Sequence, residues 1–174
     1  TLGTASVIAD NRFGATLVED PSPFPDGHAV AFHFKDDEKT GAGVAVVNTD
    51  GSGFQKLTPP DGCGHAAVSP DGKTIACTRS RDGHVVLIRR DGDRWLPPAD
   101  LPLSTTPSDY LAMDSRFGQV KEVRHSYVEW VRPDLLLVTS HGSDGGKAFS
   151  FARLFLVQLP AAGRPLKVID LSGA

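Results

Sequence analysis

The chain has 174 residues and a net charge of −3, which is enough length for one domain with a hydrophobic core. Lysine and arginine are interspersed with aspartate and glutamate and form no basic block, so nucleic acid is not an expected partner. The longest apolar stretches, such as LLLV at 135–138, are too short to cross a bilayer. Glycine (18) and proline (13) punctuate many short apolar runs, which is typical of an all-β protein.

A repeated turn signal organises the chain. Pro-Asp-Gly occurs at 25–27 and again at 70–72, and the apolar strands AVAFHF (29–34) and TIACT (74–78) follow. A degenerate third copy, YVEWVRPDLLLVTS, occupies 127–140. Proline suits the second position of a type I turn and glycine the fourth, so each copy predicts a tight reversal between two strands. Four antiparallel strands per repeat predict β-propeller blades, with a sandwich as the alternative fold.

The repeat boundaries predict one domain of about three and a half blades. We expect a half blade at 5–20, full blades at 20–58, 59–96 and 120–172, and an insert loop at 97–119. The predicted half blade has no complement at the other end of the chain, and open sheet edges tend to pair with other strands. We therefore expect either a homodimer or a missing propeller segment to close the ring. The chain begins without methionine, and we expect a mature product or a trimmed chain.

The blade letters resemble a known family. SPDGKTIACT (69–78), FPDGHAVAF (24–32) and VVNTDGSGFQKLT (46–58) are similar to the TolB-like propeller repeat. The resemblance implies the propeller fold and suggests a periplasmic or extracellular location. It leaves activity open, because this repeat occurs in partner-binding proteins, in lyases and in accessory domains of peptidases.

The loops opposite the Pro-Asp-Gly turns are the most varied part of the sequence. Loops on a rigid scaffold commonly carry binding residues, so we expect the ligand or partner to bind this loop-rich face. The candidate residues on it are His65, His125, His141, Asp82, Asp144, Tyr110 and Phe117. Other aromatic side chains lie in predicted strands and are expected to pack between blades, namely Phe32, Tyr127, Trp130 and Phe155.

Histidines mark the start of two predicted inner strands. His65 and His125 occupy the same place in two blades, and His141 with Asp20 or Asp82 would complete a transition-metal or acid–base site. The spacing is no local metal signature, so polar histidines at strand starts are the simpler interpretation. We predict no cofactor.

The two cysteines are predicted to be diagonal neighbours. A turn centred near Pro70 and Asp71 places Cys77 opposite His65 and diagonal to Cys63, at the outer limit for a disulfide. Cys77 is otherwise a small core residue.

The sequence therefore favours a non-catalytic binding module for a protein, peptide or small ligand. The alternatives are a metal-dependent lyase or hydrolase and an accessory propeller fragment of a serine peptidase.

Overall fold

The computed structural model describes residues 17–35, 42–59, 62–79, 81–145, 149–160 and 165–171, which form three antiparallel sheets, one per blade. Blade 1 contains β1 (Leu17–Pro23), β2 (Ala29–Lys35), β3 (Ala42–Asn48) and β4 (Gln55–Lys56). Blade 2 contains β5 (Cys63–Val68), β6 (Thr74–Arg79), β7 (His84–Asp91) and β8 (Arg94–Trp95), with β9 (Ala99–Asp100) also paired to β7. Blade 3 contains β10 (Glu122–Arg132), β11 (Leu135–Ser143), β12 (Phe149–Gln158) and β13 (Lys167–Asp170). The predicted all-β fold of four-stranded antiparallel blades is confirmed.

The Pro-Asp-Gly turns make the reversals that their letters predict. In blade 2 the Gly72 N–H donates to the Ser69 carbonyl at 2.8 Å, and Gly72 has a φ of +69°. The Asp71 carboxylate accepts from the Ser69 hydroxyl at 2.6 Å and from the Lys73 N–H at 3.0 Å. These bonds fix the turn between β5 and β6, because they satisfy polar groups that the reversal leaves without sheet partners.

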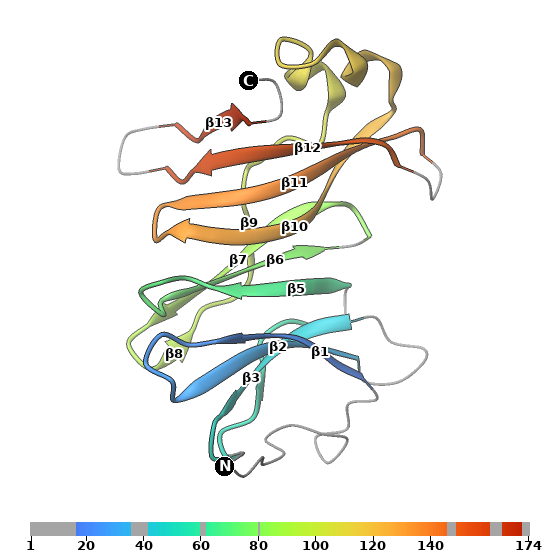
Figure 1. The fold of residues 1–174 in the computed structure, drawn as a ribbon. Coiled ribbons are helices and arrows are strands. Elements are labelled where there is room, and N and C mark those ends of the chain that lie inside the picture. Colours follow the sequence, from blue (N-terminus) through green and yellow to red (C-terminus); the bar gives the residue numbers. More distant parts are fainter. Residues whose placement is uncertain are drawn as a thin grey trace, which may run out of the picture.

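Blade 2 lies between the other two blades, and apolar side chains fill both interfaces (Figure 1). Hydrogen bonds also join blade 2 to blade 3. The Trp130 indole N–H donates to the Ala67 carbonyl at 2.9 Å, and the Thr78 hydroxyl donates to the Ser126 carbonyl at 2.8 Å. Burial of each large side chain contributes about 1.5–3 kcal/mol, so blade stacking is the main source of stability.

The predicted packing aromatics divide into two groups. Phe32 and Phe155 are buried and Trp130 is half-buried, as expected. Tyr127 is 55% exposed, so its prediction as a core residue is wrong. A bulge in β10 between His125 and Tyr127 shifts the strand register and leaves the ring at the surface.

The insert forms part of the core. It contains β9 and two 3₁₀ helices, η2 (Pro107–Tyr110) and η3 (Ser115–Gln119). The ring of Tyr110 stacks on Phe155 at 5.4 Å, and Phe117 lies 4.9 Å from Phe151. The buried carboxylate of Asp114, at the start of η3, accepts hydrogen bonds from Arg116 and Arg153. The insert is thereby fixed against blade 3.

Two further expectations concern the ends of blades. Residues 5–16 of the predicted half blade lie outside the described part of the chain, whereas residues 17–20 belong to β1, and 17–19 of them pair with β2. In the described part of the chain, the pairing of β1 with β2 includes Leu17, which lies opposite Lys35. Cys63 and Cys77 form a disulfide with their Cα atoms 6.0 Å apart, and both are buried.

Candidate binding site on the inner strands

The first strand of each blade (β1, β5 and β10, hereafter the inner strands) carries a bulge at a similar depth. Asp20 and Pro21 together oppose one residue of β2, and His65 and Ala66 together oppose one residue of β6. Asp20 has a φ of +51° and His65 a φ of +52°, a left-handed conformation that is uncommon for residues with a Cβ atom. Bulges re-aim side chains, and here they turn Asp20 and His65 toward each other.

His65 connects all three blades. Its Nδ1 atom lies 3.0 Å from Oδ2 of Asp20 in blade 1, and its ring centroid lies 4.1 Å from that of Tyr127 in blade 3. The His65 side chain is 38% exposed, so the imidazole is a surface group held from two sides. The three blades must be assembled before this contact can form.

A hollow of about 500 Å³ opens beside these rings (hereafter the inner-strand hollow). It is lined by β1, β5 and β10 through Asp20, Pro21, Ser22, Pro23, His65, Ala66, Tyr127, Val128 and Glu129. Its lining is polar and apolar in about equal parts, and it includes the carboxylates of Asp20 and Glu129. Such a surface favours cations, since carboxylates attract them through charge and tyrosine through its ring face.

Two other hollows have carboxylates that already accept hydrogen bonds from neighbouring residues. One, of about 620 Å³, lies at the outer edge of blade 3, where Arg132 and Gln158 both bond to Asp134. The other, of about 540 Å³, lies between the two Pro-Asp-Gly turns, where the Asp26 and Asp71 carboxylates accept bonds from the turn backbone. The carboxylates of Asp26, Asp71 and Asp134 in these two hollows therefore hold turns and strand ends.

A second group of ionisable side chains adjoins Asp20. His33 Nδ1 lies 3.8 Å from Oε2 of Glu19 and 4.0 Å from Oδ2 of Asp20. The His33 ring lies over the backbone of Gly64, where an added Cβ would be 3.5 Å from Cε1. Burial lowers the pKa of His33, although the charges of Asp20 and Glu19 oppose that shift.

The three histidines considered as alternative metal ligands, His65, His125 and His141, do not form a cluster of ligand atoms among the described residues. His125 is buried, with Nδ1 2.8 Å from the Ser140 hydroxyl and Nε2 3.1 Å from the Ser104 carbonyl. His141 Nε2 lies 2.7 Å from the Ser126 hydroxyl. Burial lowers the pKa of both side chains, that of His125 to about 4. Among the described residues, the group with three mutually close ligand atoms is instead Glu19, Asp20 and His33.

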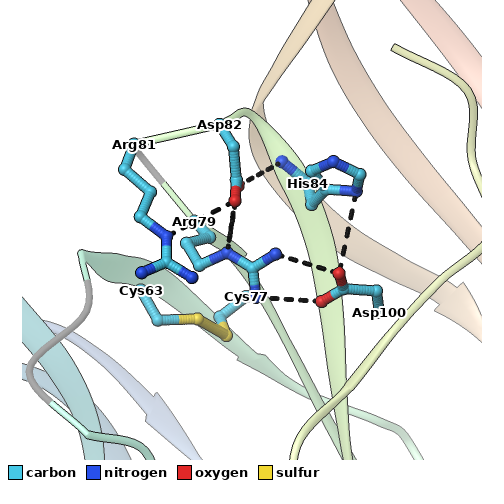
Figure 2. A network of polar contacts seen from close by, with 7 residues as sticks. All are labelled: Cys63, Cys77, Arg79, Arg81, Asp82, His84 and Asp100. Carbon is cyan, nitrogen blue, oxygen red and sulfur yellow. Dashed lines mark hydrogen bonds and ion pairs between the residues drawn. A yellow bond between two sulfur atoms is a disulfide. The ribbon is translucent and has the colours of Figure 1, made fainter.

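Asp82, a predicted binding residue of the loop-rich face, accepts hydrogen bonds from Arg79 and from the His84 N–H. Figure 2 shows its carboxylate beside Arg79, which also forms two bonds of 2.9 Å to Asp100 of β9. Burial raises the pKa of Asp82, but hydrogen bonds from Arg79 and from the His84 N–H outweigh it and lower the pKa. This network joins the β6–β7 turn to the insert, and the Cys63–Cys77 disulfide lies beneath it (Figure 2).

The remaining predicted site residues divide between core and surface. Tyr110 is 2% exposed and Phe117 is fully buried, so neither presents its ring to a ligand in this structure. Their apolar rings fill the space between the insert and blade 3, which is why a loop-like sequence is not a surface loop here. Asp144 is exposed at the end of β11.

Sequence reasoning missed Glu19, His33 and the exposure of Tyr127. A signal for Asp20 was present, because Asp20 precedes His65 by the same 45 residues that separate Pro25 from Pro70. No comparable signal marks His33, which lies in the apolar strand β2 of blade 1, directly beside β1.

Comparison with known proteins supports the architecture. No protein-family model matches the chain, and no curated protein matches it. A solved structure named as TolB from Agrobacterium tumefaciens aligns over 90% of this chain, with a TM-score of 0.59 and 16% identity. The chain has the fold of a TolB-like β-propeller. An acylaminoacyl peptidase solved with a chloromethyl ketone aligns over 94% of the chain, with a TM-score of 0.50 and 16% identity.

The chain spans 50% of the length of that TolB protein and 25% of that of the peptidase. Likeness at this level of identity concerns the fold alone. In the described part of the chain, no helix is long and apolar enough to span a membrane.

Proposed function

We propose that this propeller is a non-catalytic binding module that holds a positively charged side chain of a protein or peptide in the inner-strand hollow. The observation that carries the proposal is the contact between His65 and the 55% exposed ring of Tyr127, with the Asp20 carboxylate 3.0 Å from the imidazole. One exposed aromatic face and the carboxylates of Asp20 and Glu129 border the same hollow.

These groups suit a lysine or arginine side chain. A cation over a tyrosine ring gains about 0.5–2 kcal/mol, and a carboxylate within reach adds a charge-assisted hydrogen bond. The varied loops around the inner strands would supply further contacts with the same partner. As part of the same proposal, we predict that a second copy of the chain or a further propeller segment closes the ring of blades.

Binding is favoured over catalysis by the surroundings of His65. Within the described lining of the hollow, the aliphatic hydroxyl belongs to Ser22, and its Oγ accepts the Val68 N–H at 3.0 Å. No serine, threonine or cysteine of that lining is hydrogen-bonded to His65, so the histidine has no nucleophile to activate there.

The test is fluorescence polarisation with two labelled peptides of equal length, one with three arginines and one with citrulline at the same positions. Citrulline keeps the shape of arginine and loses its charge. We expect the arginine peptide to bind at least about tenfold more tightly, and Tyr127→Ala to weaken that binding by about tenfold, or ~1.4 kcal/mol.

Val131→Ala is the matched control, because Val131 is 54% exposed on the same strand and lies outside the hollow. Equal binding of the two peptides, no binding of either at millimolar concentration, or unchanged binding by Tyr127→Ala would each overturn the proposal.

A further inference from the structure

Three potential ligand atoms converge beside the inner-strand hollow. Oxygen atoms of Glu19 and Asp20 and a ring nitrogen of His33 all lie within 4.8 Å of one another. The two carboxylates come from the bulged stretch of β1 and the imidazole from β2, so the blade backbone sets their separation. Unlike His65, His125 and His141, considered only as alternative metal ligands, these side chains bring their ligand atoms together.

Their spacing suits a bridging ion better than direct bonding. The His33 nitrogen is 3.8 Å from the Glu19 oxygen and 4.0 Å from the Asp20 oxygen, both too long for hydrogen bonds. Ligand atoms bound to one zinc ion at about 2.0–2.2 Å are separated from each other by roughly 3–4 Å. An ion between these three side chains would therefore require only small side-chain movements.

His33 gives an independent indication of a missing ligand. Both of its ring nitrogens are buried, and neither has a hydrogen-bond partner among the described residues. A buried polar atom without a hydrogen-bond partner lowers the free energy of unfolding by about 1–3 kcal/mol. Such an atom in a folded protein therefore calls for an explanation, and an ion bound to it is one. The ring lies against the backbone of Gly64, where an added Cβ would be in ordinary van der Waals contact with it, 3.5 Å from Cε1.

We propose that Glu19, Asp20 and His33 form a site for a divalent transition-metal ion such as Zn²⁺. His65 is the positioning residue, because its Nδ1 lies 3.0 Å from Oδ2 of Asp20 and can orient that carboxylate. One imidazole with two carboxylates selects zinc or manganese over calcium, which prefers oxygen ligands throughout. Three protein ligands leave a position for water or a ligand donor.

The inference goes beyond the proposed partner-binding role. The metal site needs no partner, and it shares only Asp20 with the inner-strand hollow. Metal binding is measured without peptide and peptide binding is measured with a chelator present, so either idea can fail while the other stands.

The experiment is calorimetric titration of the full chain, stripped with a chelator, with ZnCl₂ and then with CaCl₂. We expect one Zn²⁺ per chain and at least tenfold weaker Ca²⁺ binding. Glu19→Gln and His33→Gln should each weaken Zn²⁺ binding by about tenfold or more. Glu19 is 52% exposed at its side chain, so its replacement tests the site even if the His33 variant folds poorly.

His28→Gln is the matched control, since His28 is exposed in the turn between β1 and β2 and is absent from the cluster. Its zinc affinity should equal that of the unmodified protein. The proposal is overturned if Zn²⁺ does not bind, if Glu19→Gln binds it unchanged, or if His28→Gln weakens binding equally.

Discussion

His65 and Asp20, whose side chains meet at 3.0 Å, are equivalent residues of neighbouring blades. Each is the first of two bulge residues that face a single residue of the next strand, and each has a φ near +50°. The repeat therefore reproduces a strained backbone position as well as a turn. At this position the side chains carry ionisable groups instead of the glycine that the backbone would favour, which is consistent with use of the site.

The first prediction compares two replacements of His65. A residue with a Cβ atom pays about 1–2 kcal/mol in the left-handed conformation, and a β-branched side chain pays most. Both His65→Gly and His65→Val lose the contacts with Asp20 and Tyr127, so their difference isolates the backbone. We expect His65→Val to have a free energy of unfolding about 2 kcal/mol below that of His65→Gly, measured by urea denaturation.

The same pair of replacements at His84 is the control. His84 begins β7, and its φ is not among the positive values of the described residues. Valine stabilises an ordinary strand relative to glycine, so His84→Val should be the more stable variant there. If valine is also the better residue at 65, the bulge is not strained as described.

The blades were predictable because turn letters and strand patterns are local. The Pro-Asp-Gly turn sets Val68 opposite Ile75 and Ala67 opposite Ala76, and beyond a bulge Cys63 pairs with Arg79 and Gly64 with Thr78, the register predicted for a turn centred near Pro70 and Asp71. The bulge that follows was not predictable from local pattern, because an extra residue changes pairing without changing composition. It places Cys77 opposite both His65 and Ala66.

The candidate site was harder to predict, because its parts come from three blades. Tyr127 follows strand periodicity and is read as core, yet the bulge before it leaves the ring exposed. Tyr110 and Phe117 lie in a polar, proline-rich insert and are read as surface, yet packing against blade 3 buries them. Burial here is a tertiary property that the inserted segment acquires from its neighbours.

The second prediction concerns the disulfide. Cys63 and Cys77 are separated by 14 positions, and a cross-link closing a loop of about 15 residues stabilises a protein by ~3 kcal/mol. The double variant Cys63→Ala/Cys77→Ala should lose about that free energy of unfolding in urea. Both cysteine side chains are buried, and alanine is chosen because its side chain puts no unpaired polar atom into the core.

A thiol titration of the denatured, unreduced protein provides the check on the bond itself. We expect no reactive thiol before reduction and two after it. Two thiols before reduction, in protein prepared under oxidising conditions, would contradict the bond. An intact bond would also agree with the expected periplasmic or extracellular location, because such compartments preserve disulfides.

The third prediction is a loss of stability in mild acid through His125. Burial is the largest cause of its low pKa, which lies at about 4 instead of the ordinary 6.5, although the hydrogen bond to the Ser104 carbonyl opposes the shift. The neutral form is favoured in the folded state, so its stabilisation is complete above pH 6.5 and is lost as the pH falls toward 4. Between pH 7.5 and 4.5 we expect a loss of about 2–3 kcal/mol, measured by urea denaturation at each pH.

His125→Gln should remove most of that pH dependence, whatever its effect at pH 7.5, because glutamine does not titrate. His84 and His141 also lower the pKa of His125 through their charge, so part of the slope depends on them. His28→Gln replaces an exposed histidine and should leave the slope as it is in the unmodified protein. A His125→Gln variant that loses as much stability between pH 7.5 and 4.5 as the unmodified protein would show that the buried imidazole is not the acid-sensitive group.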